Sequence, residues 1–150
     1  MRSKPLPDRP KSTAAPTAKV LFACVHNAGR SQMAAAFFAK LANSKRAYAI
    51  SAGTRPEERV HNEVVETMRE VGVDLSSARP QRLTPELAQG ADLLITLGCG
   101  DECPFVPGLR REDWSLEDPK SQPLERVRAI RDEIKNRVTE LLRREGWSRT

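Results

Sequence analysis

Cys24 and Arg30 stand six positions apart in the stretch VLFACVHNAGRSQMA, which begins at Val20. An ionised thiol is a nucleophile, and a guanidinium offers paired N–H donors that suit two oxygens of an oxyanion. Five residues lie between them, including the small Ala28 and Gly29, and they are enough to curl a loop whose backbone N–H groups point inward. A loop of this kind at the start of a helix binds a tetrahedral anion. The spacing therefore predicts a cysteine nucleophile aimed at a bound oxyanion.

The surroundings of Cys24 favour the thiolate over the thiol, because a helix N-terminus and Arg30 both stabilise negative charge. The alternative interpretation is an inert buried thiol with an unrelated surface arginine, since cysteine is among the residues most often buried. The position of the pair, after an apolar run and before a helical pattern, favours the functional interpretation.

Short apolar runs and helical periodicity alternate from Lys19 onward, with no internal repeat. We expect strands over 19–24, 47–51 and 92–97, a fourth strand near 114–116, helices over 31–41, 60–71 and 124–142, and a short helix capped by Thr84. This alternation predicts an α/β fold, a three-layer sandwich in which right-handed crossovers join a four-stranded parallel sheet. Ligands of such sheets bind beyond the carboxyl ends of the strands, which is where Cys24 stands.

The chain has 150 residues, of which 39% are hydrophobic and 30% charged, and this suits one globular domain over 19–150. Residues 1–18 are rich in proline and carry four basic side chains against one acid, so we interpret them as a flexible basic tail. The tail accounts for more than half of the net charge of +5. Because no aromatic residues are interleaved with these charges, we expect no nucleic-acid partner.

The composition also bears on compartment and cofactors. No apolar run approaches the roughly 20 residues that a membrane span needs, and residues 1–20 lack the apolar core of a signal peptide, so we expect a cytoplasmic protein without a membrane partner. Three cysteines do not suit a structural disulfide framework, and with no clustered histidine they are too few for a closed zinc site. We expect no metal and no tightly bound cofactor.

The segment CVHNAGRSQMA resembles the phosphate-binding loop of the low-molecular-weight protein tyrosine phosphatase superfamily, and more closely that of the arsenate reductases built on this fold. ISAGT, HNEVVETMREVGVDLS, LITLGCGDECP and DWSLEDP follow in the order that those reductases show, so the resemblance runs from Lys19 to the last helix. It implies the low-molecular-weight phosphatase-like, flavodoxin-like fold. It also implies an oxyanion-binding loop made of Val25, His26, Asn27, Ala28, Gly29, Arg30 and Ser31.

The resemblance implies roles for individual residues. Cys24 would attack arsenate while Asp118, in an Asp-Pro pair, protonates the departing oxygen; an ordinary Asp-Pro turn is the alternative. Cys99 would then attack Cys24, arsenite would leave, and Cys103 would attack Cys99, so that a Cys99–Cys103 disulfide remains for thioredoxin to reduce. From the residues alone, metal ligation and inert structural thiols are the alternatives for these two cysteines.

Smaller roles and departures follow from the same resemblance. Asn27 would brace the loop, and the Ser31 hydroxyl would hydrogen-bond the thiolate or cap a helix. His26 stands where many members carry glycine; it could contact the oxyanion or merely cover the loop, and we favour the cover. Gly29 replaces a second loop cysteine of several members, and Ala35 stands where relatives that bind potassium carry an acid, which makes that site doubtful here.

Alternative functions remain open at this level. The same loop and Asp118 could hydrolyse a phosphomonoester, as in a low-molecular-weight phosphotyrosine phosphatase, without any need for Cys99 and Cys103. Mycothiol or another low-molecular-weight thiol could replace thioredoxin as the electron donor. We expect a monomer that binds arsenate, with phosphate and sulfate as competing oxyanions.

Overall fold

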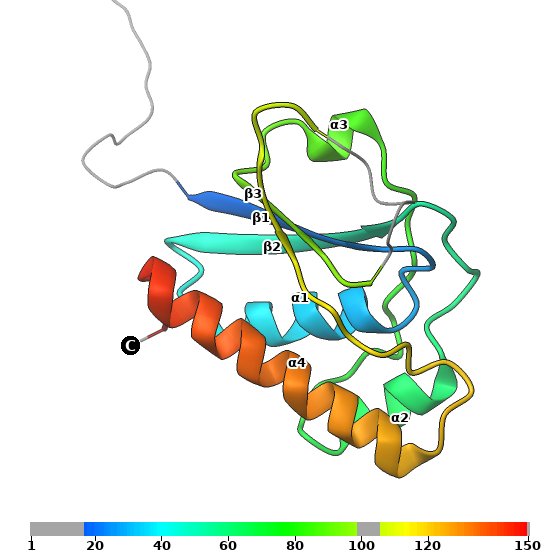
Figure 1. The fold of residues 1–150 in the computed structure, drawn as a ribbon. Coiled ribbons are helices and arrows are strands. Elements are labelled where there is room, and N and C mark those ends of the chain that lie inside the picture. Colours follow the sequence, from blue (N-terminus) through cyan, green and yellow to red (C-terminus); the bar gives the residue numbers. More distant parts are fainter. Residues whose placement is uncertain (1–16, 99–105, 150) are drawn as a thin grey trace, which may run out of the picture.

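The protein is described by a computed structural model that covers residues 17–98 and 106–149. The described residues form four strands and four helices in the order β1 (Ala18–Cys24), α1 (Arg30–Leu41), β2 (Ala47–Gly53), α2 (Asn62–Arg69), α3 (Pro85–Ala88), β3 (Leu93–Thr96), β4 (Arg110–Asp113) and α4 (Leu124–Glu145). Figure 1 shows how they are arranged. The strands form one sheet in the order β2-β1-β3-β4, and every neighbouring pair is parallel.

The sheet places its switch point at the end of β1. From β1 the chain crosses to β2 on one side and then returns to β3 on the other, so β1 has a parallel partner on both edges. Cys24 is the last residue of β1 and pairs in register with Gly53 of β2. The predicted α/β sheet is confirmed, and Cys24 stands where such sheets bind their ligands.

Alternating residues of β1 serve two cores. Val20, Phe22 and Cys24 belong to the larger core, to which α1, α2 and α4 contribute on one face of the sheet. Leu21 and Ala23 belong to a smaller core on the other face, where α3 lies. Because β1 is buried on both faces, its sequence is an uninterrupted apolar run rather than an alternating one. The predicted three-layer sandwich is confirmed.

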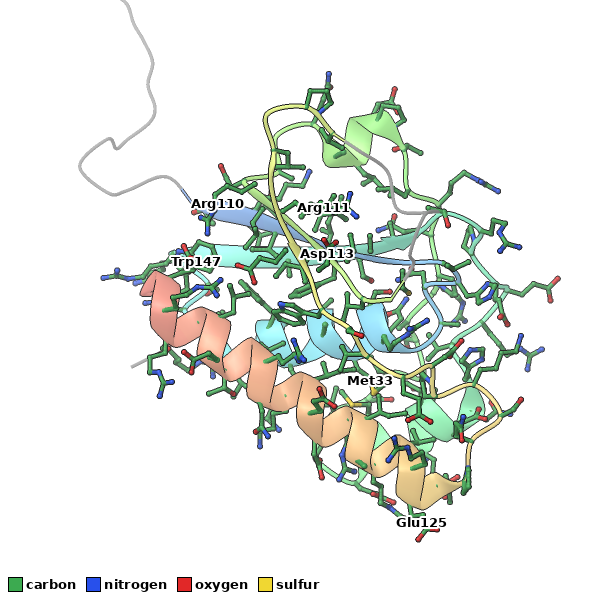
Figure 2. All side chains as sticks on the ribbon, in the orientation of Figure 1. Met33, Arg110, Arg111, Asp113, Glu125 and Trp147 are labelled. Carbon is green, nitrogen blue, oxygen red and sulfur yellow. The ribbon has the colours of Figure 1, made fainter. Side chains whose placement is uncertain are left out.

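The fourth strand lies a few residues before its predicted position near 114–116. Arg110 and Asp113, labelled in Figure 2, belong to an edge strand whose side chains are mostly exposed, so no apolar run marks it in the sequence. Trp114 extends the ladder by one bond, since its N–H donates to the Thr96 carbonyl at 2.8 Å. Its indole lies in the larger core, with its ring centroid 5.8 Å from that of Phe22.

The helices begin and end close to the predicted residues. The Thr84 hydroxyl caps α3 by accepting the Leu87 N–H at 3.1 Å, and α4 ends at Gly146 with a φ of 77°. On α4, Arg131 is a buried cation that donates to the Thr67 carbonyl at 2.8 Å and thereby ties α4 to α2. Within residues 17–98 and 106–149, no helix is long and apolar enough to cross a membrane.

Candidate active site

The connection between β1 and α1 curls around the Cys24 sulfur. Asn27 adopts a left-handed conformation with φ of 50°, and its backbone N–H donates to Cys24 Sγ at 3.3 Å. The Ser31 hydroxyl lies 2.8 Å from the same sulfur. Cys24 itself is 3% exposed, so few water molecules reach the sulfur. The Asn27 N–H and the Ser31 hydroxyl thus both lie within hydrogen-bond distance of this buried sulfur.

Asn27 braces the loop from within and is fully buried. Its Nδ2 donates to Ser31 Oγ at 2.7 Å, and its Oδ1 accepts the Gln81 N–H at 2.9 Å and Gln32 Nε2 at 3.2 Å. The bond from Gln81 ties the loop to a segment 54 residues further along the chain. Gln32 and Gln81 were not among the predicted site residues.

The oxygens near Asn27 already have donors. Gln32 Nε2 also donates to the Asn27 carbonyl at 3.1 Å and to the Arg79 carbonyl at 3.3 Å. Ala35 offers no side-chain oxygen. Residue 35 therefore supplies no side-chain ligand for a cation beside Asn27. Across the part of the chain that the structure describes, no group of three His, Cys, Asp or Glu side chains could hold a metal.

The Arg30 guanidinium is held at the carboxyl edge of the sheet, and its side chain is 9% exposed. Nη1 donates to the Leu116 carbonyl at 3.0 Å, and Nη2 lies 3.7 Å from Asp118 Oδ2. Gly98, just after β3, has a φ of +83°, and a Cβ there would overlap Arg30 Nη1. Glycine is therefore required where the guanidinium passes the end of β3.

Asp118 stands at the open side of this group, with 47% of its side chain exposed. Its Oδ1 accepts the N–H of Lys120 at 3.0 Å, which fixes the carboxylate in a local turn. Pro119 is buried over Gly29, where an added Cβ would lie 2.9 Å from Pro119 Cγ. The turn is thus seated directly on the loop, and it leaves no space for a side chain at residue 29.

The first turn of α1 adds backbone N–H groups to this side of the loop. Gly29 is the N-cap, and among the described residues this helix start has no side-chain cap and no acid in its first turn. Its first N–H groups have no partner within the helix and carry the positive end of the helix dipole. Together with Arg30 they can hold the oxygens of a tetrahedral anion beside the sulfur.

The structure brings Cys24, Asn27, Arg30, Ser31 and Asp118 together, and the rest of the predicted loop lies between them. His26 turns its Nδ1 toward the Arg55 carbonyl at 3.2 Å, and the backbone N–H of His61 donates to the Ala28 carbonyl at 3.0 Å. Cys99 and Cys103 lie outside the described residues.

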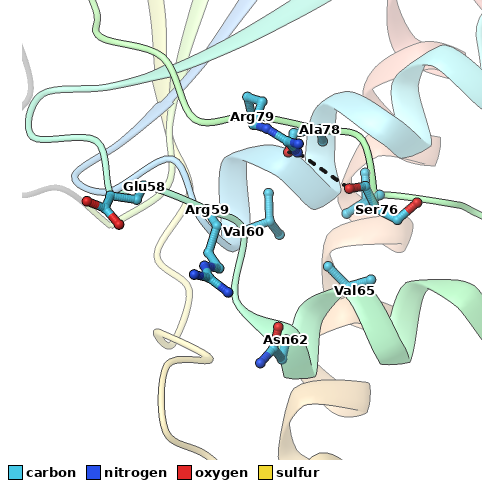
Figure 3. A pocket seen from close by; sticks show the side chains of 9 residues that line it. Glu58, Arg59, Val60, Asn62, Val65, Ser76, Ala78 and Arg79 are labelled. Carbon is cyan, nitrogen blue, oxygen red and sulfur yellow. Dashed lines mark hydrogen bonds between the residues drawn. The ribbon is translucent and has the colours of Figure 1, made fainter.

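A separate pocket of about 490 Å³ lies beside the start of α2, as Figure 3 shows. Its lining includes Glu58, Arg59, Asn62 and Arg79, and the Arg79 guanidinium is bonded to the Ser76 carbonyl at 3.4 Å. No residue from 24 to 31 lines it. This pocket therefore shares no wall with the loop around Cys24.

A cysteine at the end of a parallel strand, followed by a loop and by an arginine at the start of a helix, is an arrangement that can hold a tetrahedral oxyanion beside a thiol. Residues 19–146 match the family described as low molecular weight phosphotyrosine protein phosphatase. The chain belongs to this family, which confirms the resemblance that its motifs indicated.

Relatives within the family are named as arsenate reductases. A putative arsenate reductase of Halobacterium salinarum is 40% identical over 130 residues, which are 83% of this chain and 91% of the relative. A glutaredoxin arsenate reductase of Synechocystis is 38% identical over 127 residues, with 83% and 95% covered.

A solved structure of a thioredoxin-dependent arsenate reductase from Corynebacterium glutamicum has a TM-score of 0.73 and 42% identity to this chain. The match covers 87% of this chain, which spans 62% of that protein's length. A solved arsenate reductase in an oxidized state has a TM-score of 0.74 and 36% identity, with 85% and 98% covered.

Proposed function

We propose that this protein is an arsenate reductase that uses Cys24 as its nucleophile. The observation that carries the proposal is the buried Cys24 sulfur, which accepts a hydrogen bond from the Asn27 N–H and shares one with the Ser31 hydroxyl, in the loop that leads to Arg30. Arsenate is a tetrahedral oxyanion of the size that such a loop binds. The names of the relatives at 40% and 38% identity support the same substrate.

In the first step the Cys24 thiolate attacks arsenic, an S–As bond forms, and one oxygen leaves as water. Hydroxide is a poor leaving group, so a proton must reach that oxygen, and the Asp118 carboxyl group, 3.7 Å from Arg30, is placed to supply it. Arg30 and the N–H groups at the start of α1 stabilise the negative charge on the remaining oxygens. Arsenic is still pentavalent in the adduct.

Reduction follows when the Cys99 thiolate attacks the Cys24 sulfur. An S–S bond forms, the S–As bond breaks, and its electron pair stays on arsenic, which departs as trivalent arsenite. Cys103 then attacks Cys99, which leaves a Cys99–Cys103 disulfide and restores the Cys24 thiolate. Gly98 supports this order, because the residue that directly precedes Cys99 in the chain lies against the Arg30 guanidinium.

The electron donor in this proposal is thioredoxin, a dithiol that can reduce the final disulfide. The 42% identical Corynebacterium protein is named as thioredoxin-dependent, whereas the Synechocystis relative is named for glutaredoxin. We infer a soluble, monomeric, cytoplasmic enzyme without a tightly bound cofactor or metal, built as one domain over 19–150 after the tail over 1–18.

The test is arsenite formation by the purified protein with NADPH and either thioredoxin with its reductase or glutathione with glutaredoxin. Cys24→Ser should abolish arsenite with both donors. Cys99→Ser and Cys103→Ser should abolish it with thioredoxin. If these two variants form arsenite with a low-molecular-weight thiol alone, the relay is wrong. That thiol would then attack the arsenic adduct directly.

Hydrolysis of phosphomonoesters is the second candidate, favoured by the same loop and by the position of Asp118 beside Arg30. It would proceed through phosphocysteine and would not use Cys99 or Cys103. Rapid hydrolysis of p-nitrophenyl phosphate without any arsenite formation would establish this function in place of the reductase.

A further inference from the structure

Glu57 connects the two segments that flank the oxyanion loop. Its backbone N–H donates to the His26 carbonyl at 3.0 Å, so its main chain is fixed to the loop itself. Its Oε2 lies 3.1 Å from Lys120 Nζ, in the turn that carries Asp118. One residue is therefore bonded to the loop through its backbone and to the turn through its carboxylate.

The carboxylate of Glu57 is held from more than one side. His26 Nδ1 lies 3.7 Å from Oε2, and His61 Nδ1 lies 4.0 Å from Oε1. The Glu57 side chain is 30% exposed, so it is shielded more than a typical surface acid. These neighbours restrict its rotamers and keep the carboxylate facing Lys120.

Lys120 connects this carboxylate to Asp118. Its N–H donates to Asp118 Oδ1 at 3.0 Å, while Asp118 Oδ2 lies 3.7 Å from Arg30 Nη2. Pro119, between them, is buried on Gly29 without room for a Cβ. The Glu57–Lys120 pair, which we name the rim latch, thus joins the segment over 54–61 to a turn that already touches the loop.

The leaving group of the reaction departs on the side of the loop where Asp118 lies. In an in-line displacement the departing group lies opposite the attacking sulfur, beside the acid that protonates it. For arsenate that group is a single hydroxyl. For a phosphomonoester it is an oxygen that carries an organic group, which must extend outward past Asp118, the residue whose turn also carries Lys120.

We propose that the rim latch selects small inorganic oxyanions by narrowing the exit beside Asp118, and that it disfavours ligands with an aryl group on the anion. This inference deepens the proposed function and rests on it for the identity of the natural substrate. The substrate class that it assigns to the loop is the free tetrahedral oxyanion.

The test compares two ligands in binding, without turnover. Titration calorimetry gives the Kd of inorganic phosphate and of phenylphosphonate for the unaltered protein, Glu57→Gln and Lys120→Gln. Both ligands carry the same kind of anionic group, so removal of a charge changes both Kd values in a similar way. The ratio of the two Kd values therefore measures how strongly the exit hinders the phenyl group. We expect this ratio, phenylphosphonate over phosphate, to fall in each variant by up to about fivefold, because opening the exit releases at most the stability of one exposed ion pair.

Two further variants serve as controls. Glu58→Gln removes the neighbouring exposed acid, which lines the separate pocket of Figure 3, and it should leave the ratio unchanged. The double variant Glu57→Gln/Lys120→Gln should match the single variants, since the two residues act as one unit. An unchanged ratio in both single variants, or equal changes in all variants including Glu58→Gln, would overturn the proposal.

The outcome is separable from that of the proposed function. A protein that binds phosphate but forms no arsenite with any donor would overturn the reductase, while the Kd ratio would still decide the role of the rim latch. A protein that forms arsenite but shows an unchanged ratio in both single variants would overturn the rim latch alone.

Discussion

The Leu116 carbonyl accepts a hydrogen bond from Arg30 Nη1 at 3.0 Å, although the two residues are 86 positions apart. This bond orients the guanidinium at the end of β3, where Gly98 leaves the necessary space. Arg30 is therefore held by the segment that also carries Asp118. The geometry of the candidate site depends on contacts between distant segments as much as on the loop itself.

Gly98→Ala should disrupt the position of Arg30. The new Cβ would overlap the guanidinium and would also lie 3.2 Å from the Leu116 carbonyl, so Arg30 would have to move. We expect the Kd for phosphate to rise at least about tenfold, the factor of a strong charged hydrogen bond. Gly108→Ala is the matched control, because Gly108 has a similar φ of +81° but nothing within 4 Å of an added Cβ. Equal losses of affinity in both variants would attribute the effect to backbone strain alone.

Much of the fold follows from local sequence patterns. The apolar run from Val20 and the helical stripe of α4 are long and regular, and their predicted ranges match the structure. The edge strand was misplaced because Arg110–Asp113 is a charged segment whose strand character comes from pairing with β3. Burial of Trp114 and Leu116 produced the apolar signal just after it.

The candidate site, like the fold, combines features that local sequence patterns reveal with features that depend on contacts between distant segments. The loop could be recognised because its residues are contiguous and lie between a strand and a helix. The supports of the loop could not, because Gln81, Leu116 and Glu57 contact it from separate segments and none has a distinctive neighbour in the sequence. Contacts between distant residues depend on how the chain is packed, which short motifs do not encode.

Asn27→Ala should weaken both the loop and the fold. It removes the donor to Ser31 and the acceptor for Gln81, both in a buried setting, and it places alanine at a φ of 50°. We expect the free energy of unfolding to fall by about 2–4 kcal/mol, from the unpaired polar groups and the strained backbone. Urea unfolding measures this change. Asn43→Ala is the control, because Asn43 is a half-buried turn residue whose Oδ1 accepts the Lys45 N–H, and a loss below about 1 kcal/mol for Asn27→Ala would contradict the bracing role.

Asp118→Asn should separate binding from proton transfer. The amide keeps the size of the side chain but cannot donate a proton in the way that a carboxylic acid does. We expect kcat for arsenate to fall about 100-fold or more with little change in KM. Steady-state arsenite formation measures both constants. Glu117→Gln, at the adjacent exposed acid that pairs with Arg126, should leave kcat within about twofold, the size of a typical surface effect. A matching fall in that variant would argue against a specific role for Asp118.

Thr96→Val should change how the stability of the folded protein depends on pH, because it raises the pKa of Asp113. Two hydrogen bonds hold the pKa of Asp113 below its usual range. The bond from the Thr96 hydroxyl has the larger effect and the bond from Arg111 the smaller. A carboxylate whose pKa is lowered by folding stabilises the native state above its unfolded pKa, and this contribution is lost as the pH falls through the lower, folded value. Removing the Thr96 donor should therefore raise the pKa of Asp113 in a carboxyl NMR titration. It should also make the stability difference between the two proteins larger at pH 7 than at pH 2 in thermal unfolding. Thr139→Val, whose hydroxyl bonds only the Lys135 carbonyl among the described contacts, should show no such pH dependence, and a pKa of Asp113 unchanged by Thr96→Val would contradict the assignment.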